Sequence, residues 1–397
     1  MSLNQTPTAN RLQIGIFGCR NSGKSSLINA LTGQDLAIVS DLKGTTTDPV
    51  SKAMELSPLG PVVLIDTPGL DDHGEIGKLR VAKAKQVLNR SDLCLLVIDS
   101  TIGISHHDQE IMAQIDERNL PFIVVHNKAD TQNVIPSPTP GHIFISAKRG
   151  DNIHTLKEMI GDLGTAKYKE KPLVRDLLSP QDLVMLVTPI DEAAPKGRLI
   201  LPQQQVIRDI LDFSAYAIVV KDTELEQVLG RLGTLPDLVI TDSQVFGNVA
   251  KILPKEIPLT SFSILFARYK GDLETLTDGV QFMSQLRDGE NVLISEGCTH
   301  HRQCNDIGTV KLPIWVKEFS GKELNFSFTS GNEFPKDLTD FAMVIHCGGC
   351  TLNEKEMKHR MKIARENNVP MTNYGTAIAH MNGILERSTA VFKRIEA

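Results

Sequence analysis

The sequence lacks the features that would place it in several common classes of protein. No apolar run among its 397 residues approaches the ~20 residues that a membrane span needs. Residues 1–11 are polar and lack the apolar stretch of a signal peptide. The formal net charge of -6 gives no global basic field for nucleic acid or a membrane surface. We therefore expect a cytoplasmic protein of two or three domains that has neither of these partners.

Cysteine is also scarce, with six residues in the chain. Six cysteines in a cytosolic chain of this length do not indicate a disulfide framework. Four of the six lie in the last 100 residues, and this clustering needs its own explanation. Of the others, Cys94 lies in an apolar strand and is expected in the core. Cys19 is expected to be a small filler, with a redox-sensitive thiol as the alternative.

Residues 11–165 alternate short apolar runs with amphipathic helical stretches. This rhythm predicts an α/β fold with a doubly wound, mostly parallel sheet, whose ligands bind beyond the carboxyl ends of the strands. The expected strands are Leu12–Phe17, Val62–Asp66, Leu93–Asp99, Phe122–Asn127 and His142–Ser146.

A charged stretch at 168–172 ends in proline and predicts a linker, after which two further α/β blocks follow. We expect three α/β domains in all, with bounds 1–168, 169–265 and 266–397. The expected strands of the later blocks are Asp182–Val187, Ala217–Val220, Asp237–Thr241, Leu259–Phe262, Asn291–Ser295, Asn325–Phe328, Ala342–His346 and Pro370–Asn373. A single closing helix is expected over Gly375–Arg387.

The segment Gly18-Cys-Arg-Asn-Ser-Gly-Lys-Ser25 fits the phosphate-loop pattern G-x-x-x-x-G-K-[ST] between a strand and a helix. Its glycines let backbone N–H groups turn inward around phosphates, and the following helix points its positive end at them. Lys24 is expected on the β- and γ-phosphates and Ser25 on Mg²⁺. The alternative is a chance match to a short pattern. The predicted phosphate site comprises Gly18, Asn21, Ser22, Gly23, Lys24, Ser25 and Ser26.

Three further motifs argue against a chance match. Each follows an expected strand, and they occur along the chain in the order typical of GTPases. In Asp66-Thr-Pro-Gly69, Asp66 can hold Mg²⁺ through water and the Gly69 N–H can meet the γ-phosphate. In Asn127-Lys128-Ala-Asp130, the Asp130 carboxylate can accept both N–H donors of a guanine edge, which adenine does not offer. The motifs therefore favour GTP over ATP. The last motif, Ser146-Ala147-Lys148, would present the Ala147 N–H to the guanine oxygen.

The candidate for the first switch is Gly44-Thr45-Thr46-Thr47, between the phosphate loop and Asp66. We expect Thr46 to be the Mg²⁺ ligand, and a polar surface loop is the alternative. The predicted catalytic residues are thus Lys24, Thr46, Asp66 and Gly69.

Two details of this region resemble the TrmE–Era branch of the translation-factor-like GTPases. Leu70 stands where Ras-like proteins place a catalytic glutamine, so another group must orient water, and slow turnover is expected. Asn21 occupies the position that helps to bind K⁺ in the potassium-activated members of that branch. The resemblance implies a K⁺ role for Asn21, and the chemistry of a turn residue is the alternative.

Cysteine and histidine gather in two segments that follow expected strands. The first is Cys298-Thr-His300-His301, and the second is His346-Cys347-Gly-Gly-Cys350. If the two strands are neighbours, three thiolates and up to three imidazoles converge. Thiolates select zinc or an iron–sulfur cluster, and the ligand types leave both open. Cys304 is expected to be a bystander, with a spare ligand as the alternative.

The whole chain resembles the HydF family of [FeFe]-hydrogenase maturation GTPases, on the pattern C-T-H-H followed by H-C-x-x-C behind a TrmE–Era-type GTPase. The resemblance implies a middle domain for homodimerisation and a C-terminal domain with a [4Fe–4S] cluster on Cys298, Cys347 and Cys350. The fourth site, or the second shell, would fall to His300, His301 or His346.

The activity that this resemblance implies is that of a GTPase scaffold or carrier. It would assemble or deliver the diiron precursor of the hydrogenase H-cluster, with radical-SAM maturases and the apo-hydrogenase as partners. Two alternatives remain at this point: a ribosome- or tRNA-associated GTPase, and a GTPase with a structural zinc site.

Overall fold

The computed structural model describes residues 10–33, 50–57, 59–69, 75–131, 135–167, 171–190, 199–298, 306–331 and 333–394. The chain forms two compact units, residues 1–170 and 171–397, and each is an α/β structure. Within the described ranges, no helix combines the length and the apolar character needed to cross a membrane.

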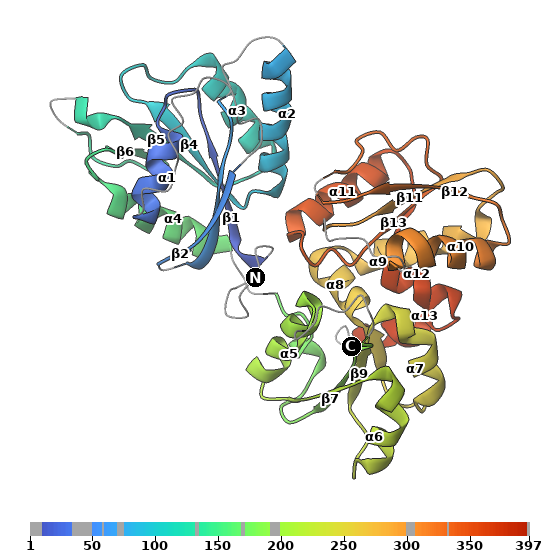
Figure 1. Ribbon diagram of the computed structural model, residues 1–397. Helices are drawn as coiled ribbons and strands as arrows, with labels where there is room; N and C mark the ends of the chain where they lie inside the picture. Colours follow the sequence, from blue (N-terminus) through green and yellow to red (C-terminus); the bar gives the residue numbers. More distant parts are fainter. Residues whose placement is uncertain are drawn as a thin grey trace. The chain divides into compact units, whose positions relative to one another are not determined.

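The N-terminal unit is built on a six-stranded sheet with the order β2-β3-β1-β4-β5-β6 (Figure 1). Only β2 is antiparallel to its neighbour. The strands are β1 Leu12–Phe17, β2 Val50–Leu56, β3 Gly60–Asp66, β4 Leu93–Asp99, β5 Phe122–Asn127 and β6 His142–Phe144. The expected doubly wound, mostly parallel sheet is confirmed.

Helices cover both faces of this sheet because its strands are buried on both sides. One core joins the sheet to α1 and α4, and a second core on the opposite face joins it to α2 and α3. The helices are α1 Lys24–Thr32, α2 Glu75–Arg90, α3 His106–Glu117 and α4 Ile153–Lys167. This layering leaves the carboxyl ends of the parallel strands at one edge of the sheet, where ligands of such folds bind.

The antiparallel strand β2 was not expected from the sequence. It is an edge strand, and most of its side chains are exposed or half-buried. Val50, at its start, is 59% exposed. A strand of this kind carries no buried apolar run, which is the signal that identified its neighbours.

The C-terminal unit contains two four-stranded sheets, and all their strand pairs are parallel. The first has the order β10-β9-β7-β8 and the second β12-β11-β13-β14. Their strands are β7 Leu183–Val187, β8 Tyr216–Val220, β9 Leu238–Thr241, β10 Leu259–Ser261, β11 Asn291–Ser295, β12 Asn325–Thr329, β13 Met343–His346 and β14 Met371–Asn373.

The helices of this unit are α5 Leu201–Asp212, α6 Leu225–Arg231, α7 Phe246–Ile252, α8 Phe262–Lys270, α9 Leu273–Val280, α10 Leu312–Ser320, α11 Glu354–Glu366, α12 Tyr374–Met381 and α13 Leu385–Thr389. The expected closing helix is thus two helices. Gly383, at φ +68, lies in the break between them. Its left-handed backbone is incompatible with a continuous helix.

One hydrophobic core connects the two sheets of the C-terminal unit. It contains Met185 and Val187 of β7 together with Val292 and Ile294 of β11. The expected domain boundary between residues 265 and 266 falls inside α8. The division of this unit into a dimerisation domain and a cluster-binding domain stays a proposal.

Candidate functional site

The phosphate loop follows β1 and is shaped by two glycines with left-handed backbone. Gly18 has φ +145, and a Cβ there would lie 2.2 Å from the Val97 oxygen. Gly23 has φ +92, and a Cβ there would lie 2.1 Å from Nδ2 of Asn127. Larger residues are therefore excluded from both positions. At these two positions no side chain enters the loop, and the backbone can therefore turn inward towards bound phosphates.

Lys24 begins α1 and fixes the phosphate loop from within. Its Nζ donates to the carbonyl oxygen of Gly18 at 2.9 Å and to that of Cys19 at 2.8 Å. The Lys24 side chain is buried, so its ammonium lies inside the loop rather than in solvent. A triphosphate would find a preplaced positive charge there.

Ser25 and Asp66 form the candidate Mg²⁺ site. The Oγ of Ser25 donates to Oδ2 of Asp66 at 3.2 Å. The other oxygen, Oδ1, is buried and makes no hydrogen bond within the part of the chain that the structure describes. Burial raises the pKa of Asp66, and the charge of Lys24 partly opposes that rise. A buried carboxylate oxygen without a donor, beside a hydroxyl, fits a hard divalent cation such as Mg²⁺.

Thr67 joins the end of β3 to β1. Its N–H and its Oγ1 both donate to the carbonyl oxygen of Ile16, at 3.2 and 2.7 Å. These bonds fix the backbone that leads to Gly69, the last residue described before the gap at 70–74. The predicted switch residue Thr46 and the glutamine-replacing Leu70 lie outside the described residues.

Asn127 connects the phosphate loop to the predicted base-binding loop. Its Nδ2 donates to the Ser22 carbonyl at 3.0 Å, and its Oδ1 accepts the Ala147 N–H at 3.0 Å. The expected guanine donor, the Ala147 N–H, therefore binds Asn127 here. Ser146 Oγ donates to Oδ1 of Asp130 at 2.8 Å, and this bond holds the pKa of Asp130 below its usual value. The carboxylate is thus ionised and ready to accept N–H donors.

Asp99 belongs to this site and was not anticipated from the motifs. Its Oδ2 lies 2.6 Å from Nζ of Lys128, whose backbone is left-handed at φ 63. Burial alone would raise the pKa of Asp99, but hydrogen bonds from Lys128 and Thr101 keep it below its usual value. Its position in the sequence could have identified Asp99, because this residue ends β4, which lies between two strands that are followed by recognised motifs.

The two cysteine segments meet in the C-terminal unit. Strands β11 and β13 are neighbours, with Ser295 opposite His346, so the condition for convergence holds. The Gly297 N–H donates to Sγ of Cys347 at 3.1 Å, and a Cβ on Gly297 would lie 3.5 Å from the Gly349 Cα. Cys298, Cys347 and Cys350 therefore lie on two loops in direct contact.

The sulfur atoms of Cys347 and Cys350 have their proton affinity altered by their surroundings. The Gly349 N–H gives Cys347 Sγ a second hydrogen bond, at 3.4 Å. Burial raises the pKa of Cys347 to about 11 and also raises that of Cys350. Their thiolates therefore need a cation close by to be stable, and soft sulfur donors fit iron or zinc. The candidates His300 and His301, and the extra Cys304, lie outside the described residues.

His346 is fully buried and both its ring nitrogens have partners. Nδ1 lies 2.7 Å from the Cys347 carbonyl, and Nε2 lies 3.0 Å from Nη1 of Arg360. A guanidinium only donates, so Nε2 accepts and Nδ1 carries the proton. Burial, with the charge of Arg360, lowers the pKa of His346 to about 3. His346 had two expected roles, as a metal ligand or as a residue that orients a ligand. This geometry favours the second role, in which His346 orients the Cys347 backbone.

Two buried cations near the cysteines carry no motif and were missed. Arg360 is fully buried and, besides its contact with His346, donates to the Gly331 carbonyl at 2.6 Å. Lys270 is 2% exposed. Its Nζ donates to the carbonyl oxygens of Gly349 at 3.1 Å, Cys350 at 2.8 Å and Leu352 at 2.6 Å. Burial lowers the pKa of Lys270 to about 8. The available signal for Lys270 was a lysine that ends a helix whose first half is largely apolar.

Three family models match the chain. The model described as a 50S ribosome-binding GTPase matches residues 13–128. The hydrogen maturase F dimerization domain matches residues 173–271, and the hydrogen maturase F tetramerization domain matches 274–391. The chain belongs to the HydF family. Its N-terminal unit is the GTPase domain of this HydF chain, and the matched models make the C-terminal unit an oligomerisation region.

Individual relatives of this HydF chain align with about a third of its length. GTPase Der of Kosmotoga olearia is 39% identical over 127 residues, which are 31% of this chain and 28% of the relative. The tRNA modification GTPase MnmE of Thiobacillus denitrificans is 35% identical over 147 residues, 37% of this chain and 32% of the relative. The chain thus spans about a third of the length of these curated relatives.

Among solved structures, Era of Aquifex aeolicus with GDP and aluminium fluoride is similar at a TM-score of 0.34 and 22% identity. The match covers 53% of this chain and 92% of that one.

Proposed function

We propose that this HydF family member is a GTPase scaffold that holds a [4Fe–4S] cluster on Cys298, Cys347 and Cys350. The proposal rests chiefly on one observation, the Gly297 N–H bonded to the sulfur of Cys347. That bond joins the two cysteine loops and places an N–H donor on a sulfur, a contact that tunes the potential of iron–sulfur clusters. The cluster would supply an iron atom whose fourth position a ligand can occupy.

The environment of His346 favours a cluster over closed structural zinc. Zinc would need four protein ligands in a tetrahedron. On the two cysteine loops, the described residues offer three cysteines, while both ring nitrogens of His346 make hydrogen bonds. A closed zinc site would thus depend on His300, His301 or Cys304. Three thiolates with an exchangeable fourth position suit the role of an attachment point for the diiron precursor of the H-cluster.

We assign the GTPase reaction to the phosphate loop and its neighbours. Lys24 would neutralise the β- and γ-phosphates, while Ser25 and Asp66 would hold Mg²⁺. The Gly69 N–H would hold the γ-phosphate, and Asp130 would select guanine. With Leu70 in place of a glutamine, turnover would be slow. K⁺ near Asn21 would then supply the positive charge for the transition state.

The same proposal names the partners of the chain and a role for GTP hydrolysis. The chain would form a homodimer, receive its cargo through radical-SAM maturases and pass it to the apo-[FeFe]-hydrogenase. GTP hydrolysis would order and release the switch segments at 45–47 and 66–70 and so alter partner binding. The GTPase would then regulate the scaffold.

Anaerobic reconstitution with iron and sulfide tests the cluster. We expect a brown protein with about four iron atoms per chain. A variant with Cys298→Ala, Cys347→Ala and Cys350→Ala should stay colourless. Cys94→Ala is the matched control, because Cys94 is buried in β4 of the GTPase unit and should not affect iron content.

Two results would overturn the scaffold proposal. One is a colourless wild-type protein that holds a single tight zinc ion after the same treatment. The other is iron content that survives the triple substitution. Retention of RNA by the chain at moderate salt would instead favour the ribosome- or tRNA-associated alternative, since such binding rests on phosphate contacts.

A further inference from the structure

The last turn of α8 holds two segments that are far apart in the sequence. We call residues 171–178 the leading segment, since they open the C-terminal unit directly after the GTPase unit, and residues 347–352 the cluster loop. Arg268 contacts the leading segment and Lys270 contacts the cluster loop. Side chains two residues apart on a helix point about 200° apart around its axis, so the two cations reach opposite ways.

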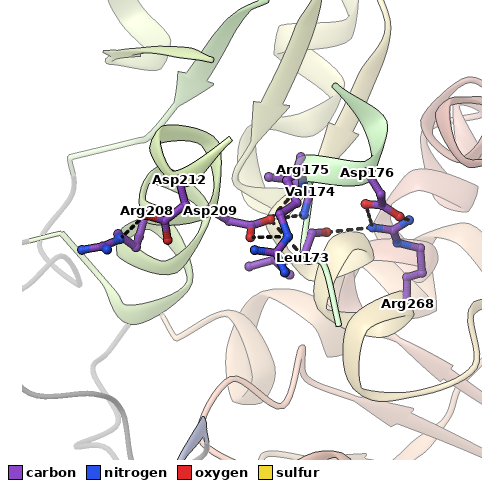
Figure 2. Close-up of polar contacts among 8 residues, drawn as sticks. All are labelled: Leu173, Val174, Arg175, Asp176, Arg208, Asp209, Asp212 and Arg268. Carbon is purple, nitrogen blue, oxygen red and sulfur yellow. Dashed lines mark hydrogen bonds and ion pairs between the residues drawn. The ribbon is translucent and has the colours of Figure 1, made fainter. Parts of the chain in front are cut away.

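Arg268 fixes the leading segment through three hydrogen bonds, shown in Figure 2. Its Nη1 and Nη2 donate to the two carboxylate oxygens of Asp176, both at 2.8 Å. Nη2 also donates to the Leu173 carbonyl at 2.9 Å. A bidentate pair of this kind sets direction as well as distance. The leading segment therefore has a defined position on α8.

Asp209 of α5 holds the same segment from a second helix. Its Oδ2 accepts the backbone N–H groups of Leu173, Val174 and Arg175 at 3.1, 2.7 and 2.9 Å (Figure 2). One carboxylate thus satisfies three consecutive donors. The leading segment is clamped between α5 and α8.

Lys270 fixes the cluster loop just as firmly. Three carbonyl oxygens of the loop accept from its Nζ, and the three hydrogens of an ammonium group match these three acceptors. A second contact comes from the start of α8, where a Cβ on Gly348 would lie 3.5 Å from the Cα of Ser263. The loop that carries Cys347 and Cys350 therefore rests on α8 at both ends of the helix.

Apolar packing and a third cation connect the leading segment with the cluster loop. Leu173, Val174 and Phe266 belong to one buried core, and Cys350 packs against it. Nζ of Lys171 donates to the Arg268 carbonyl at 3.1 Å and lies 3.6 Å from Glu354, which begins α11 directly after the loop.

We propose that Arg268 and Lys270 are positioning residues that set the geometry of the cluster cysteines according to the position of the leading segment. The chain leaving the GTPase unit is thereby tied to the cluster loop within the C-terminal unit. This rests on the proposed function, in which Cys347 and Cys350 hold the cluster. It gives the scaffold a physical element through which the leading segment acts on the iron site.

The test compares Asp176→Asn and Lys270→Met with Asp212→Asn, all in the full chain. Asp176→Asn weakens the Arg268 pair and touches no atom of the cluster loop. Asp212→Asn is the matched control, because it weakens the Arg208–Asp212 pair at 2.7 Å on the same unit (Figure 2). The readouts are alkylation rates of Cys347 and Cys350 in metal-free protein by mass spectrometry, and the electron paramagnetic resonance spectrum of the reduced cluster.

We expect about tenfold faster alkylation for Lys270→Met and roughly threefold faster for Asp176→Asn, since Lys270 bonds the cluster loop directly and Asp176 acts on it through Arg268. Both should shift the g-values of the cluster, whereas Asp212→Asn should match wild type. If Lys270→Met does not fold, the comparison of Asp176→Asn with Asp212→Asn tests the proposal by itself. Circular dichroism then shows whether Asp176→Asn is folded. GTPase activity should be unchanged in all folded variants.

The proposal is overturned if folded Asp176→Asn protein matches Asp212→Asn in both readouts. That outcome differs from failure of the proposed function, in which the wild-type protein itself would take up no cluster. Lys270→Arg, which restores N–H donors to the loop, should recover at least part of the wild-type spectrum if Lys270 acts by positioning.

Discussion

Nδ2 of Asn127 donates a hydrogen bond to the carbonyl oxygen of Ser22 at 3.0 Å. The two residues lie 105 positions apart in the chain, yet this bond ties the base-binding loop to the phosphate loop. Since the other side-chain atom of Asn127 accepts the Ala147 N–H, one amide holds three loops of the nucleotide site in register.

Substitution Asn127→Ala should therefore weaken GTP binding by roughly tenfold or more, because two hydrogen bonds are lost at about 1 kcal/mol each. Isothermal titration with GDP and with a non-hydrolysable GTP analogue measures the change. Gln109→Ala, an exposed position on α3, is the control and should bind as wild type does. Unaltered affinity in Asn127→Ala would refute the bridging role.

Lys24→Ala should reduce GTP turnover to below about a hundredth of wild type, because the ammonium inside the phosphate loop is lost. Iron content after reconstitution should stay as in wild type. Phosphate release and iron analysis on the same preparation provide both values. The control is Lys85→Ala, an exposed lysine on α2. Loss of iron together with turnover would mean that the two sites are not separate modules.

Asn21 allows a clean test of the potassium role. Its backbone is left-handed at φ 61, a conformation that glycine adopts without strain. Asn21→Gly thus removes the side chain and keeps the loop. Wild-type GTPase activity should rise when Na⁺ is replaced by K⁺, and the rise should be lost in Asn21→Gly. Equal rates in the two salts for wild type would eliminate the K⁺ role, and stimulation that persists in the variant would leave Asn21 as a turn residue.

His126 should make the stability of the GTPase unit depend on pH. Burial, and then the neighbouring His142 ring at 3.2 Å, lower the pKa of His126 below its ordinary 6.5. The folded unit then binds this proton more weakly than the unfolded chain does. The stabilising contribution is complete above pH 6.5 and is lost as the pH falls through that value towards the lower pKa of the folded state.

His126→Phe should flatten this dependence, because its ring still stacks on Phe144, 4.3 Å away between centroids, and does not titrate. Calorimetric unfolding of the full chain at about pH 5.5 and about pH 7.5 measures it. His154→Phe, at an exposed histidine on α4, is the control. A wild-type slope that persists in His126→Phe would mean that other groups cause the acid sensitivity.

The sequence by itself predicted the candidate nucleotide site because the motifs of that site are local. Gly18, Gly23 and Lys24 lie within seven residues of one another, and each motif follows a strand that can be recognised in the sequence by its apolar run. The carboxyl ends of parallel strands share an edge, so the motifs that begin at Asp66 and Asn127 were expected along the same edge of the sheet. The same logic brought the Cys298 and Cys347 segments together on β11 and β13.

Only the tertiary structure decided what surrounds those residues. Edge strand β2 shows no buried pattern, and the break at Gly383 depends on one backbone angle. Lys270 and Gly349 lie 79 positions apart, and no sequence spacing links a lysine to the carbonyl oxygens of a distant loop. The hydrogen bonds of Lys270 and His346 arise because these are buried polar groups that must find partners. Packing selects those partners, whereas the local pattern of residues does not specify them.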